Sequence, residues 1–125
     1  MTPGHLELRY LLDLNGEVMV LDKEAKYWAK FRVEPVANTP DRPHGIKYSL
    51  TLHDRANARI AGIDNAHAIS VGSGPGRQRT VVRDHMHRLA VVKPYSFKGA
   101  GPLIRDFWEL VDSVIRELEA KNENA

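Results

Sequence analysis

The chain has 125 residues, of which 42% are hydrophobic and 27% are charged, and this is the composition of a globular protein rather than a disordered one. It contains no cysteine, which excludes disulfides, thiolate chemistry and cysteine-based zinc sites. It also lacks both a signal-peptide pattern and an apolar run of the roughly 20 residues that span a bilayer. We therefore expect a single cytoplasmic domain over residues 1–125, with no membrane contact and a frayed tail at 122–125.

The formal net charge of +2 is unevenly distributed. From Pro102 to the end, six acidic residues face three basic ones, so this stretch carries −3 and the first 101 residues carry +5. A basic body mildly favours an anionic partner such as RNA, although it is far from the charge density of a nucleic-acid coat protein.

The pattern of apolar residues predicts strands in the first half of the chain. Apolar residues alternate with polar ones over 6–14, which predicts a half-buried strand, and Asn15-Gly16 predicts a hairpin turn into a second strand at 17–21. Alternation returns over 25–36, with Tyr27, Ala29, Phe31 and Val33 on one face. The prolines at 40 and 43 predict a loop over 38–43.

The second half contains further strands and one helix. Strands are predicted at 46–53 and 58–63, a long loop at 70–78 and an extended segment at 79–92. An apolar stripe predicts a helix over 102–121, begun by Pro102. The expected fold class is α+β, a mostly antiparallel sheet of five or six strands with one C-terminal helix packed on it.

Candidate chemistry gathers between residues 64 and 88. On an extended strand, Arg83, His85 and His87 share one face, while Asp84 and Arg88 take the other. Two imidazoles on one face can act as acid and base, or can bind a common metal ion. An exposed polar strand with two ordinary histidines has the same pattern.

The end of the 58–63 strand supplies a second group of polar residues. Asp64-Asn65 follows the strand and fits either a site or a simple Asx turn. His67 reaches the same pocket if this strand and the 79–92 segment are antiparallel neighbours, as their order in the sequence favours.

Phosphate contacts are expected from Lys47, Arg79, Arg83 and Arg88. His44 follows two prolines and is more typical of a loop. The sequence has no phosphate-binding loop of the P-loop type, no dinucleotide-binding fingerprint and no serine nucleophile motif.

The ordered segments resemble one family. They are His44-Gly45-Ile46-Lys47-Tyr48-Ser49-Leu50, Asp64-Asn65-Ala66-His67, Asp84-His85-Met86-His87-Arg88, Pro94-Tyr95-Ser96-Phe97, and Leu103 through Asp106-Phe107-Trp108 to Val111. In this order, over about residues 44–117, they resemble the TumE-type family, which is regarded as comprising toxins of type II toxin–antitoxin pairs. Lys98-Gly99-Ala100-Gly101 departs from the capping serine and acid expected at the helix entry. The resemblance implies a separate antitoxin protein as partner, and it carries no established reaction.

The leading hypothesis is a toxin that acts on RNA as an endoribonuclease. His85 and His87 are the expected acid–base pair, with Asp64 and His67 completing the catalytic set. Lys47, Arg79, Arg83 and Arg88 are expected on phosphate, and His44, Asn65 and Asp84 in support. This mechanism needs no cofactor.

Two alternatives remain open. In the first, Asp64, His67, His85 and His87 bind a divalent metal ion in a nuclease or phosphotransferase. In the second, the chain is a non-catalytic module that binds nucleic acid or protein. The sequence also leaves a homo-oligomer open.

Overall fold

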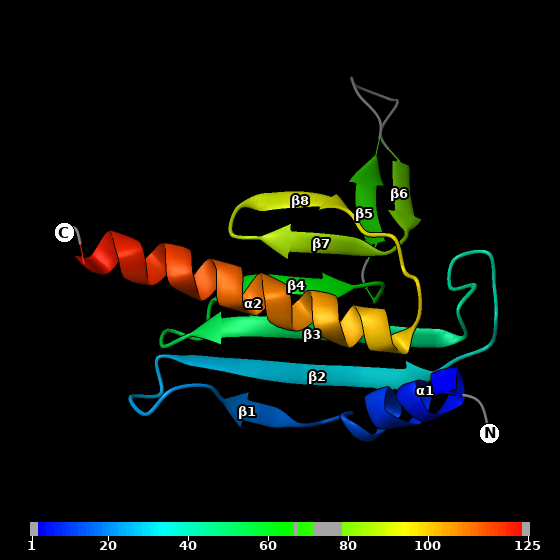
Figure 1. The fold of residues 1–125 in the computed structure, drawn as a ribbon. Coiled ribbons are helices and arrows are strands. Elements are labelled where there is room, and N and C mark those ends of the chain that lie inside the picture. Colours follow the sequence, from blue (N-terminus) through cyan, green and yellow to red (C-terminus); the bar gives the residue numbers. More distant parts are fainter. Residues whose placement is uncertain (1–2, 67, 72–78, 124–125) are drawn as a thin grey trace.

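The computed structural model describes residues 3–66, 68–71 and 79–123. The strands of one six-stranded sheet lie in the order β1-β2-β3-β4-β7-β8, every neighbouring pair is antiparallel, and β5 and β6 pair apart from it as a hairpin (Figure 1). The α+β prediction is confirmed. The elements are α1 (Pro3–Asp13), β1 (Val18–Val20), β2 (Tyr27–Pro35), β3 (Ile46–Asp54), β4 (Arg59–Asp64), β5 (Ala68–Val71), β6 (Arg79–Val82), β7 (His85–Arg88), β8 (Val91–Pro94) and α2 (Ala100–Glu123).

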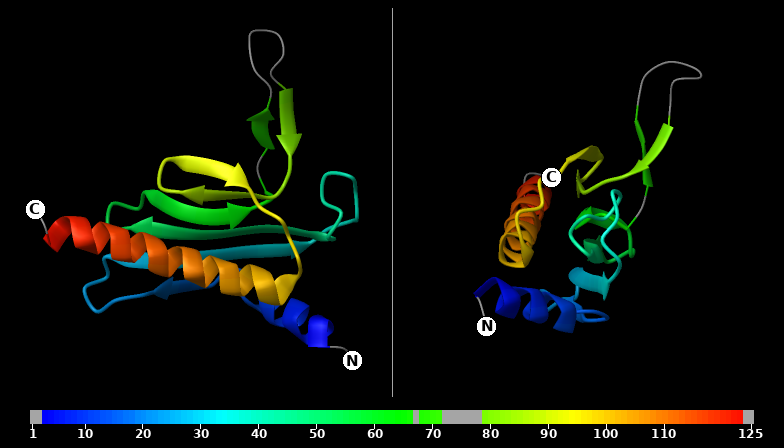
Figure 2. Two further views of the ribbon diagram at one scale, coloured as in Figure 1. Left: turned by 45° about the horizontal axis from the view of Figure 1, so that its top comes forward. Right: turned by 90° about the vertical axis from the view of Figure 1, so that its right-hand side faces the viewer.

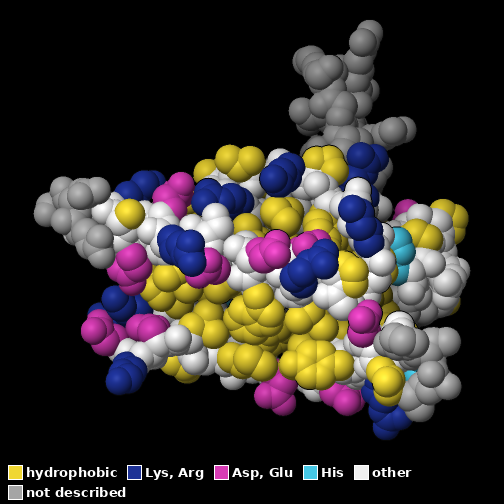
Figure 3. All heavy atoms as spheres, viewed as in Figure 1, with side chains coloured by type: hydrophobic (Ala, Val, Ile, Leu, Met, Phe, Trp, Pro, Cys, Tyr) yellow, Lys and Arg dark blue, Asp and Glu magenta, His cyan; other side chains and the backbone are white. Residues whose placement is uncertain are grey.

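Both helices lie on the same side of the six-stranded sheet, α2 across its centre and α1 beside β2 (Figure 2). The predicted helix over 102–121 is confirmed as the longer α2. Its buried stripe packs on the sheet, and Phe107 meets Phe31 edge to face with ring centroids 5.6 Å apart. Hydrophobic side chains gather between α2 and the edge strand β1 (Figure 3). The fully buried residues of α2 are Leu103, Phe107 and Val114.

Alternation along β2 and β3 separates an apolar face from a polar one, as predicted. Tyr27, Ala29, Phe31 and Val33 are buried under the helices, while the alternate residues point away from them. No described helix covers this second face (Figure 2), which we call the open face. On β2 and β3 it is formed by Trp28, Lys30, Arg32, Glu34, Lys47, Ser49, Thr51 and His53.

The strand predicted over 6–14 is wrong, because residues 3–13 form the helix α1. Leu8, Leu11 and Leu12 lie at helical spacing and turn toward the core, whereas Leu6 and Tyr10 are more than half exposed. Asn15-Gly16 is accordingly not a hairpin turn. The helix ends at Asp13, Gly16 takes a φ of +85° in the turn that follows, and the chain then enters β1, inside the predicted 17–21 strand.

The single extended segment predicted over 79–92 is also wrong, since it contains β6, β7 and the start of β8. The turn between β7 and β8 is made at Leu89, which takes a positive φ of 55°. Leucine carries no turn signal, and this conformation costs it about 1–2 kcal/mol. Core packing of its side chain and a hydrogen bond from its amide to the Ile60 carbonyl offset that cost.

The predicted loop over 38–43 is confirmed, as are the strands near 46–53 and 58–63. Residues 70 and 71 of the predicted 70–78 loop belong to β5, and residues 72–78 lie outside the described part. In the part of the chain that the structure describes, neither helix is long and apolar enough to cross a membrane.

Candidate active site

The expected antiparallel contact between the strand ending at Asp64 and the strand holding His85 and His87 is confirmed. Asp64 is the Cα partner of His85, and Gly62 is the partner of His87. Partners in an antiparallel pair point to the same face, so all three polar side chains lie on the open face. Gly62 has no side chain, and an added Cβ there meets the Leu50 carbonyl at 2.9 Å.

The two imidazoles converge on one carboxylate oxygen of Asp64. Asp64 Oδ2 lies 3.3 Å from Nε2 of His85 and 3.7 Å from Nε2 of His87. The two imidazole rings meet edge to face with centroids 4.7 Å apart. Asp64 and His85 are buried, with side chains 0% and 1% exposed, whereas 14% of the His87 side chain is exposed. Only His87 of the pair therefore reaches the surface.

The backbone fixes the protonation of one His85 nitrogen. Nδ1 lies 2.9 Å from the Arg83 carbonyl oxygen, which can only accept a hydrogen bond. Nδ1 must therefore carry the hydrogen, and Nε2 is left to face Asp64. Nε2 and Oδ2 of Asp64 are 3.3 Å apart, so either a hydrogen or a metal ion fits between these two atoms.

His87 is contacted from its outer side by Arg59, whose Nη2 lies 3.4 Å from Nδ1. A guanidinium only donates, so this contact favours an unprotonated Nδ1 and a hydrogen on Nε2, toward Asp64. In this tautomer the basic nitrogen of His87 is the one nearest the exposed side chain of Arg59.

Asn65 and Arg42 hold the end of β4 in place. The buried Asn65 amide accepts from the Tyr48 amide at 2.8 Å and donates to the Ile46 carbonyl at 2.9 Å, which extends the pairing with β3. Arg42 donates to the carbonyls of Asn65 and Ala66, both at 3.2 Å. Oδ1 of Asp64 accepts from the Ala66 amide at 3.1 Å, the Asx turn expected from the sequence.

Asp84 and His44 form a separate cluster at the entry of β7. The Tyr48 hydroxyl donates to Oδ2 of Asp84 at 2.5 Å, and Nε2 of His44 lies 3.5 Å from Oδ1. His44 also stacks on Phe97, with ring centroids 4.1 Å apart. Burial, and after it the Asp84 carboxylate, raise the pKa of Tyr48 far above its ordinary value. Asp84 is therefore not a partner of the histidine that follows it.

The basic residues expected on phosphate are divided among different surfaces. Lys47 is exposed on the open face, and Arg83 is exposed between β6 and β7. Arg88 lies on the helix side, where Nη1 is 3.5 Å from Glu117 and Nη2 donates to Ser113 at 2.9 Å. Arg79 begins β6, but its side chain lies outside what the structure describes, and the expected role of His67 falls on a residue outside the described part.

The three converging residues also suit a metal ion. Oδ2 of Asp64 and the Nε2 atoms of both histidines lie within 4.8 Å of one another. The distances of 3.3 and 3.7 Å from Oδ2 to the two Nε2 atoms are close to the ligand-to-ligand distance in a tetrahedral site. That distance is about 3.3 Å when each ligand lies about 2.0–2.1 Å from the ion. The bond from His85 Nδ1 to a backbone carbonyl is the outer contact that metal-bound histidines usually make.

Arg59 and Arg42 were not predicted as site residues from the sequence. Arg59 opens β4 within an apolar stretch, and the register shift between Leu52 and His53 places it opposite His53, on the face that carries His87. Arg42 lies in the proline-containing loop, more than twenty residues from the carbonyls that it contacts. Both contacts depend on tertiary structure.

The family model for toxin TumE matches residues 15–115, which is well over half of the chain. The match includes Asp64, His85 and His87. No curated protein and no solved structure matches the chain.

Proposed function

Since this chain belongs to the toxin TumE family, we propose that it is the toxin of a type II toxin–antitoxin pair and acts on RNA as an endoribonuclease. Family membership implies an antitoxin partner in general. The observation that carries the reaction is the convergence of one buried carboxylate oxygen with a buried imidazole and a surface imidazole. The proposed setting is the cytoplasm, where RNA and antitoxin meet the toxin.

In the proposed reaction, the Arg59 guanidinium turns from Nδ1 of His87 to the RNA phosphate, and Nδ1 then takes the proton of the 2′-hydroxyl. The 2′ oxygen then attacks the adjacent phosphorus, a 2′,3′-cyclic phosphate forms, and the 5′ oxygen leaves with a proton from water. Asp64 orients His87 through Nε2 and stabilises the imidazolium that forms. General base catalysis of this kind contributes about 10²–10⁴-fold.

His85 acts in this scheme without touching RNA, because its side chain is only 1% exposed. With Nδ1 fixed on the Arg83 carbonyl and a proton on Nε2, it balances the charge of Asp64 and holds the carboxylate in place. It is a positioning residue, and the acid–base pair expected from the sequence becomes one catalytic histidine with one supporting histidine.

Arg59 supplies the positive charge nearest to His87, and its side chain is solvent-exposed at the start of β4. Placed beside the reacting phosphate, it stabilises the additional negative charge of the phosphorane. Lys47 and Arg83 are the further phosphate contacts in this proposal. Arg88 is left out, because α2 holds it on the helix side.

The test is cleavage of RNA by the purified protein, together with growth inhibition on expression. We expect Asp64→Asn and His85→Asn to lower the cleavage rate at least about 100-fold. Asparagine at 85 keeps a donor for the Arg83 carbonyl and loses only the nitrogen that faces Asp64. His5→Gln, in α1, is the matched control, and thermal unfolding checks that each variant is folded.

Folded variants that keep full activity would overturn this mechanism. Growth inhibition that persists without RNA cleavage would instead favour the non-catalytic binding module.

A second candidate, a metal-dependent nuclease, is favoured by the three converging ligand atoms. Asp64, His85 and His87 would hold the ion, which would supply a Lewis acid and an activated water. Elemental analysis of the purified protein and the visible spectrum of a cobalt titration distinguish it from the first candidate. Stoichiometric metal and loss of cleavage in chelator support the second candidate, whereas metal-free protein that cleaves RNA in chelator supports the first.

A further inference from the structure

The open face carries unpaired positive charge next to the candidate active site. Among the residues that the structure describes, no carboxylate lies within 4.0 Å of the Arg32 guanidinium or the Lys47 amine. Both side chains are exposed. Basic side chains without a protein partner are available to an anion.

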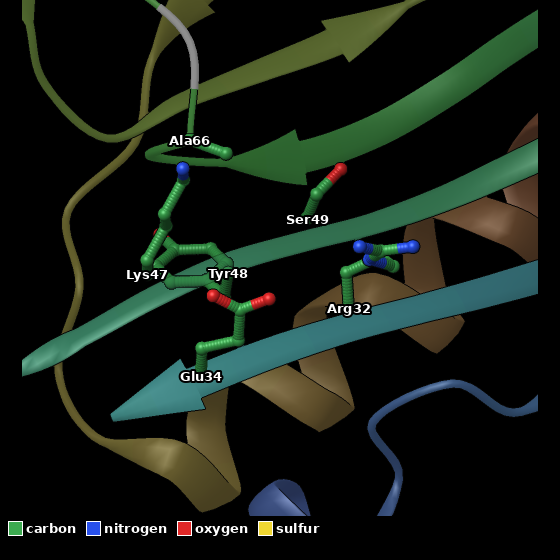
Figure 4. Close-up of a pocket in the computed structure, with 6 residues that line it drawn as sticks. All are labelled: Arg32, Glu34, Lys47, Tyr48, Ser49 and Ala66. Carbon is green, nitrogen blue, oxygen red and sulfur yellow. The ribbon is translucent and has the colours of Figure 1, made fainter. Parts of the chain in front are cut away.

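These two residues border a hollow of about 350 Å³ on the open face, whose wall also includes Glu34, Ser49 and Ala66 (Figure 4). In Figure 4 the Lys47 amine points toward Ala66, and the Ser49 hydroxyl is turned toward β4. A lysine, an arginine and a hydroxyl together are the donors that bind phosphate in proteins.

The hollow adjoins the active-site carboxylate through the strand register. Ser49 is the Cα partner of Asp64 across the β3–β4 pair, and Arg32 is the partner of Ser49 across the β2–β3 pair. Side chains of such partners on one face lie about 4.5–5.5 Å apart at Cβ. An anion in the hollow therefore lies beside Asp64 and two strand spacings, about 10 Å, from β7, which holds His87.

An aromatic pair lies farther along the same face. Trp28 and His53 are Cα partners whose rings are almost parallel, 8° apart, with centroids separated by 6.3 Å. Trp28 is half-buried and lies four residues from Arg32 on β2, about 13 Å at the usual rise of a strand. Tryptophan on a polar sheet face provides a surface on which a nucleic-acid base can stack.

We propose that the open face binds single-stranded RNA, with backbone phosphates on Arg32 and Lys47 and a base stacked on Trp28. This inference rests on the proposed function and gives its substrate a path across β3 and β2. The face suits a single strand rather than a duplex, because stacking on Trp28 requires an unpaired base. Glu34 opposes binding, since its carboxylate lies in the same hollow.

The test measures binding by fluorescence anisotropy, using a labelled 2′-O-methyl RNA oligonucleotide that cannot form the cyclic phosphate. We expect Arg32→Ala with Lys47→Ala to weaken binding at least tenfold at low salt and to reduce the salt slope by about 1.4. Lys23→Ala with Lys98→Ala removes the same charge from exposed positions elsewhere and is the matched control. Equal effects of the two double variants would overturn the phosphate assignment.

Three further variants test the remaining parts of the surface. Trp28→Ala should weaken binding about tenfold and Trp28→Phe much less, because phenylalanine still stacks. Glu34→Gln should tighten binding about two- to threefold at low salt. Equal losses in both Trp28 variants would overturn the stacking assignment.

The assay separates this proposal from the proposed function. RNA binding through these residues without any cleavage of ordinary RNA would contradict only the endoribonuclease. A wild-type protein that cleaves RNA but does not bind the oligonucleotide at about 50 mM salt would overturn only the binding surface, and the face would then be assigned to a protein partner.

Discussion

The entry of β7 is flanked by two aspartate–histidine contacts, and they differ in every property that matters for chemistry. Asp64 faces two imidazoles on the open face, and one of them is partly exposed beside an arginine. Asp84 faces His44 and accepts a hydrogen bond from the buried Tyr48 hydroxyl. The first cluster has a partly exposed imidazole, whereas the second ties a loop and a core tyrosine to the strand. Residue types alone do not distinguish a site from a structural contact.

The largest expected difference is in activity. His87→Ala should lower RNA cleavage by at least about 100-fold, because the proposed general base is lost. His44→Ala should change the cleavage rate less than about threefold, since His44 faces away from the open face. Cleavage assays on the two purified proteins measure both. Similar losses of cleavage in the two variants would contradict the assignment of His44 to a structural contact.

The next difference is in stability. Tyr48→Phe should lower the free energy of unfolding by about 2 kcal/mol, because it removes a hydrogen bond to a carboxylate from a buried position. Cleavage by the folded variant should stay near that of the wild type. Urea unfolding gives the stability change. A loss below about 0.5 kcal/mol would show that Asp84 is not held in this way.

Alkaline pH should act through the same tyrosine. The pKa of Tyr48 is raised mainly by burial, and that of Tyr95 is raised by burial and by its hydrogen bond to Asp106. The folded state therefore favours neutral tyrosine. The contribution of the two tyrosines to the free energy of unfolding is fully present below the unfolded pKa of about 10 and falls as the pH rises above it. Urea unfolding between about pH 8 and 11 should show a shallower fall in Tyr48→Phe. An unchanged slope would contradict this assignment.

The smallest expected effects separate two arginines. Arg59→Ala should lower cleavage about tenfold by removing the charge nearest to His87. Arg88→Ala should leave cleavage unchanged and lower the unfolding free energy by about 0.5 kcal/mol, because it loses one partly exposed ion pair. Cleavage assays and urea unfolding of both variants measure these effects. A stronger activity loss in Arg88→Ala would place RNA on the helix side.

The sequence predicted the parts of the fold that follow from periodicity. Alternation located β2 and β3, and the apolar stripe located α2, because burial on one face imposes a period. It failed for α1, where Leu6, Leu8 and Tyr10 fit a strand as well as a helix. It also failed at Leu89, whose turn conformation depends on core packing rather than on the residue type.

The site was predicted to a similar extent. Strand periodicity placed His85 and His87 on one face and Asp84 on the other, and the order of the strands brought Asp64 to them. The different exposure of the two histidines could not be predicted from the sequence. The contact between Arg59 and His87 could not be predicted either, because neither feature has a local sequence pattern. Both depend on how neighbouring strands cover the pair.

The register of β4 and β7 has a consequence for how this protein can change. Asp64 at the end of β4 and His85 at the start of β7 are Cα partners, so the chain leaves the six-stranded sheet and re-enters it at the same residue pair. The β5–β6 hairpin between them is a side branch whose length the six-stranded sheet does not constrain, whereas Asn65, Arg83 and Asp84 at its base belong to the scaffold. Closing a longer branch adds only about 0.6 kcal/mol per doubling. Evolution or a designer can therefore exchange this branch as a module, altering what approaches the three central residues without rebuilding the scaffold beneath them.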